Sequence, residues 1–105
     1  MRLTYATALV LLALDRGYRH GFDIIDATGL KAGTVYPILR RLDAERLAHS
    51  TWEAVQRARA EGRPPRRNYV LTAAGGRVLE DALARYPGLG RVLEERGRDA
   101  AASTA

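Results

Sequence analysis

Two adjacent arginines and a tyrosine on one predicted helix are the side chains of this sequence best suited to hold a charged partner. They lie in the segment ATGLKAGTVYPILRRLDAERL, residues 27–47, whose apolar residues recur at the spacing of one helix face. That face should be buried, and the residues between point outward. Hydroxyl, aromatic and guanidinium groups on the outward side can meet phosphates and base edges. The predicted buried residues are Val35, Ile38, Leu39 and Leu42, and the outward ones are Thr34, Tyr36, Arg40, Arg41 and Ala44.

The start of this helix offers a second kind of contact. Lys31, Ala32, Gly33 and Thr34 form its N-terminal end, where free backbone N–H groups and the helix dipole favour a phosphate. Thr34 is also a candidate N-cap, which would place Pro37 in the first turn, where its missing N–H has no intrahelical partner to lose. An earlier start would put Pro37 inside the helix and predict a slight kink.

Each outward side chain also has a plainer interpretation. Arg40 and Arg41 either contact DNA, with Arg40 at a base edge and Arg41 at a phosphate, or lie on a solvated helix face. Tyr36 either touches a phosphate or a base methyl group, or packs on the neighbouring helix. For the two arginines the spacing leaves both interpretations open, and for Tyr36 we favour DNA contact.

A second predicted helix leads into this one through a tight turn. The run FDIIDA, residues 22–27, reads as a short helix whose Phe22, Ile24 and Ile25 pack inward. Gly29 suits a left-handed residue that ends the helix at little steric cost, and Leu30 can close the corner. Together the two helices predict a helix-turn-helix.

The segments that follow predict a β-hairpin. Residues 48–53 and 68–71 have the β-branched and aromatic content of short strands. The basic segment between them, residues 54–66, contains Gly62, Pro64 and Pro65, so its distal half cannot be regular structure. The two strands should therefore form a hairpin with a long tip, a wing. Trp52 and Tyr69 are predicted to pack under this wing rather than to act as stacking platforms.

Helices are predicted on both sides of these elements. A first helix spans about Thr4–Arg16 and is followed by a loop with glycine at both ends, residues 17–21. Thr72 is placed to cap a helix that runs to about Tyr86, where Pro87 and Gly88 interrupt it. A last short amphipathic piece covers residues 89–96.

The expected fold is therefore mainly α-helical with a small β-hairpin. It is a winged helix-turn-helix in the order helix, helix, helix, strand, strand, helix, with a short C-terminal helix added. We expect a DNA-binding domain over residues 1–86, a short helical segment over residues 87–97 that could make dimer contacts, and a disordered tail over residues 98–105.

The basic residues are concentrated in the middle of the chain. The net charge is +5, and between Lys31 and Arg67 nine basic residues stand against four acidic ones, whereas the rest of the chain has eight of each. All of the excess therefore lies in one continuous third of the sequence, which is the pattern of an electrostatic footprint for nucleic acid. The wing arginines Arg57, Arg59, Arg63, Arg66 and Arg67 belong to it, and we expect some of them to engage DNA while the others stay solvated.

Other classes of protein find little support. At 105 residues the chain suits one domain, and without cysteine it has no disulfide framework and no thiolate metal site, which fits the cytoplasm. The apolar run at residues 6–14 is too short to span a bilayer and lacks a signal-peptide cleavage site. His20 with Asp23 and Asp26 is better explained by a solvated loop than by a metal or acid–base site. With no phosphate loop and no nucleophile motif, we expect no enzyme, no cofactor and no metal.

Two stretches of this sequence resemble the PadR family of winged helix-turn-helix transcriptional regulators. One is GLKAGTVYPILRRLDAERL, with Trp52 and Glu53 closing the first wing strand. The other is GRPPRRNYVLTAAG, in which Tyr69, Leu71 and Thr72 match the second wing strand and the start of the following helix, together with Gly75. A tyrosine-proline pair inside the recognition helix, combined with this wing, is far more specific than a helix-turn-helix alone. The resemblance covers roughly residues 5–85.

The resemblance implies a homodimer, a repressor by expectation, that binds an inverted-repeat operator in double-stranded DNA. The third helix would lie in the major groove and each wing beside the backbone or in a minor groove. The implied DNA-binding residues are Lys31, Ala32, Gly33, Thr34, Tyr36, Pro37, Arg40, Arg41, Arg63, Arg66 and Arg67.

The resemblance is weakest at the C-terminus. Many members of the family dimerise through a longer C-terminal helical segment, and some bind aromatic small molecules at the dimer interface. About twenty residues follow Arg85 here. Dimer contacts are therefore expected from Tyr5, Leu9, Leu12, Leu79, Leu83, Leu89, Val92 and Leu93. The alternatives are a winged-helix module that binds an acidic protein, and a sensor that responds to an aromatic small-molecule effector.

Overall fold

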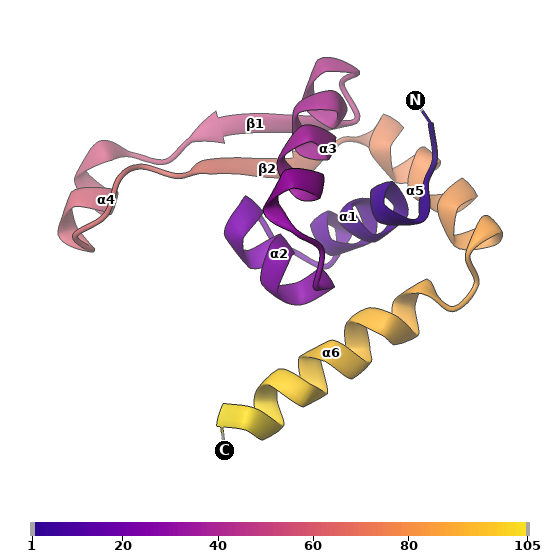
Figure 1. The fold of residues 1–105 in the computed structure, drawn as a ribbon. Helices are drawn as coiled ribbons and strands as arrows, with labels where there is room; N and C mark the ends of the chain where they lie inside the picture. The colour runs from indigo at the N-terminus through magenta and orange to yellow at the C-terminus, as the bar shows by residue number, and fades with distance from the viewer. Residues whose placement is uncertain (1, 105) are drawn as a thin grey trace.

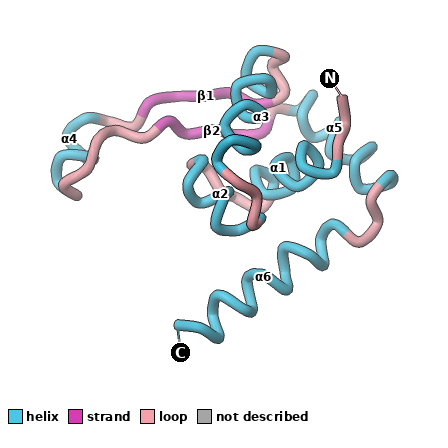
Figure 2. Tube along the Cα trace, in the orientation of Figure 1, coloured by secondary structure: helices cyan, strands magenta, loops and turns pink. Residues whose placement is uncertain are grey.

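The computed structural model describes the backbone of residues 2–104 and the side chains of residues 2–96. A helical body and a projecting hairpin make up this described part (Figure 1). Figure 2 shows the same trace by secondary structure. The elements in chain order are α1 (Tyr5–Asp15), α2 (Gly21–Thr28), α3 (Ala32–Ala44), β1 (Ala48–Trp52), α4 (Val55–Ala60), β2 (Arg67–Leu71), α5 (Ala73–Arg85) and α6 (Leu89–Thr104).

Helix α1 is the centre of the body. Every residue from Thr7 to Leu14 is buried, so this helix is enclosed all round rather than along one stripe. It packs against α2, α3, α5, α6 and β2. The first helix predicted from the sequence is confirmed, with Thr4 as its N-cap accepting a hydrogen bond from the Thr7 N–H at 3.1 Å.

The turn between α2 and α3 has the predicted form. Gly29 has a φ of +75°, and its N–H donates to the Ile25 carbonyl at 2.8 Å. Thr28 reinforces the corner, because its hydroxyl donates to the Ile24 carbonyl at 2.6 Å and accepts from the Leu30 N–H at 3.2 Å. The helix-turn-helix is therefore closed by both backbone and side-chain bonds.

One inward residue of α2 was wrongly predicted. Ile24 is fully buried and Ile25 half-buried, but Phe22 is 75% exposed. Residues two apart are separated by about 200° around the helix axis, so they lie on nearly opposite faces. Because Ile24 is buried, Phe22 points outward.

Helix α3 begins earlier than a Thr34 cap would allow. Its buried face of Val35, Ile38, Leu39 and Leu42 is as predicted. Its N-cap is Lys31, whose carbonyl already accepts from the N–H groups of Thr34 at 2.9 Å and of Val35 at 3.0 Å. The prediction of Thr34 as the N-cap is thus wrong, and Pro37 lies inside the helix. Because proline has no N–H, it cannot donate to the carbonyl of Gly33, an exposed residue four positions earlier.

The hairpin pairs β1 with β2 in antiparallel register, from Ala48 opposite Leu71 to Trp52 opposite Arg67. The Glu53 N–H extends the pairing by donating to the Arg66 carbonyl at 2.8 Å. The Tyr69 N–H donates to the Arg19 carbonyl at 2.8 Å and so ties the hairpin to the loop before α2. The wing is confirmed, but its tip contains the short helix α4, which was not predicted; the distal half, residues 61–66, is irregular as expected.

Helices α5 and α6 close the body. Thr72 caps α5 as predicted, since its hydroxyl accepts from the Gly75 N–H at 3.1 Å, and it also donates to the Arg46 carbonyl at 2.8 Å. Helix α6 returns across α1 and α2 and buries Leu89 and Leu93. Arg96 on α6 donates to the carbonyls of Asp26 at 3.3 Å and Ala27 at 3.2 Å, in the last turn of α2.

The C-terminal helix is longer than the sequence suggested. A helix over residues 89–96 with a disordered tail over residues 98–105 was expected, but α6 continues to Thr104, and residue 105 lies outside the described residues. The added stretch is rich in alanine, and each residue that extends an existing helix gains a hydrogen bond without a new nucleation cost. None of the helices in residues 2–104 is long and apolar enough to cross a bilayer.

Candidate nucleic-acid interface

The outward face of α3 presents the predicted cationic side chains. Arg40 and Arg41 are exposed, and no hydrogen bond or ion pair ties either of them to another described side chain. The buried face of the same helix, including Val35 and Leu39 at 0% exposure, fixes the helix against the body. Two unpaired guanidinium groups therefore stand on a helix that cannot easily rotate.

Tyr36 packs on the neighbouring helix, as one of its two interpretations predicts, and also keeps accessible surface. The ring is 40% exposed, yet it also lies against Gly21 at the start of α2. A β-carbon at residue 21 would overlap the ring carbons and hydroxyl of Tyr36. The glycine thus makes room for the ring, which packs on α2 and leaves one edge open to a partner.

The N-terminal end of α3 is open to solvent. Lys31, Ala32 and Gly33 are exposed and Thr34 is half-buried. The first backbone N–H groups of any helix have no partner within it. This end can therefore offer N–H groups and a positive dipole to an anion.

A polar cluster joins the base of the wing to the end of α3. The Ser50 hydroxyl donates to Asp43 Oδ2 at 2.8 Å, and an Arg67 guanidinium nitrogen donates to Ser50 Oγ at 2.9 Å and to Asp43 Oδ2 at 3.3 Å. The same guanidinium lies 5.6 Å from the centre of the Trp52 ring. This base cluster, Asp43, Ser50, Arg67 and Trp52, joins the wing to the C-terminal end of α3.

The two wing aromatics behave differently from each other. Tyr69 packs under the wing as predicted, with 6% exposure, and this burial raises the pKa of its hydroxyl. Trp52 was predicted to pack in the same way but is 67% exposed. It stands at the end of β1, and beyond that point the hairpin leaves the body and offers no surface to cover the ring (Figure 1).

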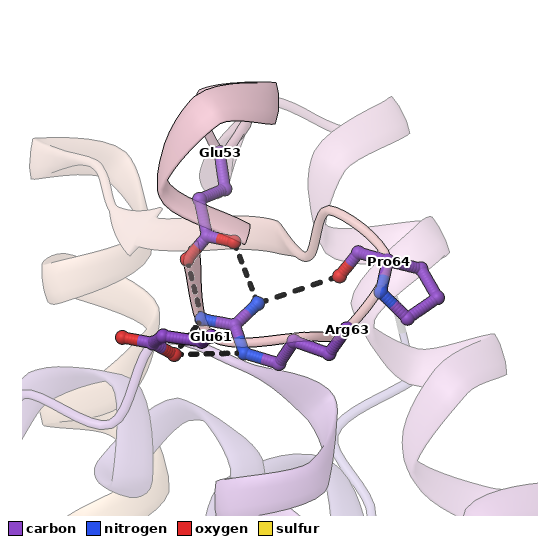
Figure 3. Close-up of polar contacts among 4 residues, drawn as sticks. All are labelled: Glu53, Glu61, Arg63 and Pro64. Carbon is purple, nitrogen blue, oxygen red and sulfur yellow. Dashed lines mark hydrogen bonds and ion pairs between the residues drawn. The ribbon is translucent and has the colours of Figure 1, made fainter. Parts of the chain in front are cut away.

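A second cluster lies at the tip of the wing, around Arg63 (Figure 3). Two guanidinium nitrogens of Arg63 donate to Glu53 Oε1 and Oε2 at 2.6 and 2.8 Å. Two donate to Glu61 Oε2 at 2.7 and 2.9 Å, and one reaches the Pro64 carbonyl at 3.4 Å. The hydrogen bonds that Arg63 donates to Glu53 lower the pKa of Glu53 from 4.5 to about 2, and the same bonds raise the pKa of Arg63. We call Glu53, Glu61 and Arg63 the tip cluster.

The wing arginines are therefore not equivalent. Arg63 is held in the tip cluster and Arg67 in the base cluster. Arg66 is half-buried, whereas Arg57 and Arg59 on α4 are exposed. The acidic partners could not be predicted from the sequence, because Glu53 and Arg63 are ten residues apart and Asp43 and Arg67 are twenty-four apart. Only the folded hairpin brings them together.

A groove of about 640 Å³ separates the helix-turn-helix from the wing. Phe22 and Tyr36 line one side, Trp52 and Pro65 line the other, and Arg66 borders it. His20 also lines the groove; it is the half-buried N-cap of α2 rather than a solvated loop residue, and its Nδ1 has no partner among the described residues. The groove thus combines flat apolar rings with positive charge, next to the exposed face of α3.

Most of the residues expected to make dimer contacts lie in the core of the chain itself. Leu9, Leu12, Leu79, Leu89 and Leu93 are at most 7% exposed, because α5 and α6 of the same chain pack onto α1. Three others retain accessible surface: Tyr5 at 45%, Leu83 at 39%, and Val92, which is half-buried. Tyr5 also packs edge-on against Tyr86 at 5.5 Å between ring centres.

Comparison with known proteins identifies one family of transcriptional regulators. Residues 10–81 match the family described as transcriptional regulator PadR-like. No curated protein matches the chain. A PadR family transcription regulator from hypervirulent Clostridium difficile R20291 is 25% identical, with 88% of this chain and 97% of that chain covered and a TM-score of 0.68.

Two further structures are similar. A PadR family transcriptional regulator from Eggerthella lenta DSM 2243 is 29% identical over 82% of this chain and 81% of that one, with a TM-score of 0.58. Bordetella bronchiseptica BpsR, whose DNA binding is regulated by 6-hydroxynicotinic acid, is 21% identical over 84% of this chain and 62% of that one, with a TM-score of 0.63. At that identity the likeness to BpsR concerns the fold alone.

Proposed function

Because this chain belongs to the PadR-like family of transcriptional regulators, we propose that it binds a specific DNA site and regulates transcription there, as a repressor. The observation that carries the proposal is that Arg40 and Arg41 are exposed and make no ion pair with another described side chain, on a helix whose opposite face is buried in the core. In the major groove, Arg40 would reach a base edge and Arg41 a phosphate, with Tyr36 and Pro37 beside them. The N-terminal end of α3, from Lys31 to Thr34, would hold a further phosphate.

We propose that the operator is pseudo-palindromic and is bound by a dimer. Two recognition helices would then lie about 34 Å apart, one turn of DNA. Tyr5, Leu83 and Val92 supply the accessible apolar surface for such a dimer, and repression would follow from occupation of a promoter. Since the partner is genomic DNA, we place this activity in the cytoplasm.

A titration of the chain against its own upstream DNA tests the proposal. Binding should prefer that fragment over unrelated DNA, and replacing Arg40 and Arg41 with alanine should abolish the preference. Each lost base contact costs about 1–3 kcal/mol, or roughly a 5- to 150-fold loss of affinity. The matched control replaces two exposed arginines of α5 and α6, Arg77 and Arg91, and should leave binding nearly intact. Non-specific binding that ignores Arg40 and Arg41 would instead favour a module that binds an acidic protein.

A ligand-responsive regulator is a second candidate, and the groove between α3 and the wing favours it. Its volume is in the usual range of small-molecule sites, roughly 300–1,000 Å³, and its aromatic lining suits a planar effector. Trp52 lines the groove, so its fluorescence would report occupancy directly. A panel of aromatic acids that neither quenches Trp52 nor releases DNA would exclude this second function at the groove.

A further inference from the structure

One of the arginines expected to bind DNA is already engaged within the protein. The guanidinium of Arg63 pairs in parallel with both oxygens of Glu53, at 2.6 and 2.8 Å, and also holds Glu61 (Figure 3). The Glu53 side chain is 8% exposed and that of Arg63 is 19% exposed. To reach a phosphate, Arg63 would have to leave a nearly buried carboxylate without its counter-charge, which is strongly unfavourable.

The tip cluster brackets helix α4. Glu53 precedes the helix, Glu61 is its C-cap residue, and Arg63 follows the turn that ends it. In that turn the Gly62 N–H donates to the Arg59 carbonyl at 3.0 Å and the Arg63 N–H to the Ala58 carbonyl at 3.1 Å. The charged side chains therefore join the two ends of α4 across the hairpin.

Helix α4 depends on this bracket for its position. Six residues are too few to form a stable helix in isolation. Figure 1 shows α4 at the far end of the hairpin, away from α1, α5 and α6. The contacts of α4 are therefore local to the wing, where Ala58 is its one buried residue and the tip cluster joins its two ends.

Helix α4 carries two exposed arginine side chains. Arg57 and Arg59 are exposed, and no acidic partner is found for either among the described side chains. Residues two apart on a helix point about 200° away from each other. Such a pair cannot converge on one phosphate, but it can reach phosphates on opposite sides of the helix.

We propose that Arg63 is a positioning residue, and that it holds α4 so that Arg57 and Arg59 contact phosphates of the two strands bordering a minor groove. These roles rest on the proposed DNA-binding function and assign its wing contacts to residues of α4. Arg63 itself contributes no phosphate contact.

Non-specific binding to a mixed-sequence DNA duplex of about three helical turns tests these contacts without knowledge of the operator. Affinity would be measured by fluorescence anisotropy at several salt concentrations, since each phosphate contact adds roughly 0.9 to the slope of log K against log salt. Replacing Arg57 and Arg59 with glutamine should reduce that slope by about two for each chain bound to the duplex. The control pair, Arg77→Gln with Arg91→Gln, removes the same charge and should leave the slope unchanged. Equal slopes for the α4 pair and the wild type would overturn the contacts.

Two further variants separate positioning from direct contact. Arg63→Lys keeps the charge but loses the two-pronged pairing, and Glu53→Gln releases the arginine. If Arg63 positions α4, both should reduce the slope by as much as the α4 pair, and both should speed tryptic cleavage in the wing. If Arg63 binds a phosphate directly, lysine should preserve the slope and Glu53→Gln should steepen it, which would overturn the proposal. A lower melting temperature with an unchanged slope would show a merely structural role and would overturn it equally.

The outcomes also distinguish this proposal from the function on which it rests. A wild-type chain that showed no salt-dependent affinity for the duplex would contradict the DNA-binding function itself. A wild-type chain with a steep slope that none of these variants changed would contradict the roles of α4 and Arg63 alone. Far-UV circular dichroism of each variant would confirm that the body is folded.

Discussion

The helical body and the wing are positioned by different forces, although both carry residues of the proposed interface. Helix α3 is fixed by burial: Val35, Leu39 and Leu42 are all at 0% exposure. The wing buries Ala48, Ala58 and Tyr69 but few large side chains, and it depends more on polar contacts, above all the base cluster at Asp43 and the tip cluster at Arg63. One half of the interface should therefore respond to changes in packing, and the other half to acid and to salt.

The largest expected effect is a loss of packing in the body. Leu39→Ala removes a fully buried side chain from α3 and should lower the free energy of unfolding by about 2–5 kcal/mol, as measured by denaturant titration. DNA affinity should fall with the folded fraction. Val70→Ala, at a position 45% exposed, is the control and should cost less than about 1 kcal/mol. Equal losses from the two substitutions would mean that burial does not hold α3.

An intermediate effect is expected when acid reaches the wing. Since the Arg63 hydrogen bonds lower the pKa of Glu53 from 4.5 to about 2, the native wing takes up a proton less readily than the unfolded chain. The stabilisation is therefore complete above about pH 4.5 and is lost as the pH falls toward 2. Fluorescence of Trp52, the single tryptophan, should report this loosening in the wing, and far-UV circular dichroism should follow the body.

Two variants isolate the contribution of Glu53 to this transition. Glu53→Gln should remove the acid-dependent part of the Trp52 signal. Glu80→Gln, at an exposed position of α5, should leave it in place. If the Trp52 signal had the same pH profile in Glu53→Gln as in the wild type, the tip cluster would not be what holds the wing.

The smallest effect is expected at the base cluster. Asp43 and Arg67 have side chains 32% and 43% exposed, so solvent screens their pairing. Asp43→Asn should change the unfolding free energy by no more than about 1 kcal/mol. It should nevertheless shift the Trp52 emission, because Arg67 would lose a partner that holds it over the ring. A loss comparable with that of Leu39→Ala would show that wing and body are one packed unit, and would remove the contrast between them.

The elements that follow strong local rules were predictable from the sequence. Helical spacing located Val35, Ile38, Leu39 and Leu42 on the buried face of α3, and glycine identified the turn at Gly29. Helix α4 was missed because its six residues carry no apolar periodicity. Phe22 was misplaced because an apolar residue in a short helix was assumed to be buried, although the orientation of Ile24 decides the matter.

The site was only partly predictable, for a different reason. Exposure of Arg40 and Arg41 followed from the helix period alone. The environment of Arg63 depended on Glu53, and no pattern along the chain links two residues on opposite arms of a hairpin. A count of basic residues treats every arginine as available, whereas the folded wing leaves some of them already paired.

The contact between Gly21 and Tyr36 has a consequence for how this sequence can change over generations. The Tyr36 ring fills the place of a side chain at residue 21, so residue 21 can become larger only if residue 36 becomes smaller. Any relative with a larger residue at the position of Gly21 should carry a smaller one at the position of Tyr36. The two substitutions should therefore appear together in a set of related sequences, and a relative with bulky residues at both positions would show that the loop before α2 can move aside. The aromatic group on α3 therefore depends on the residue fifteen positions upstream, at the first position of α2.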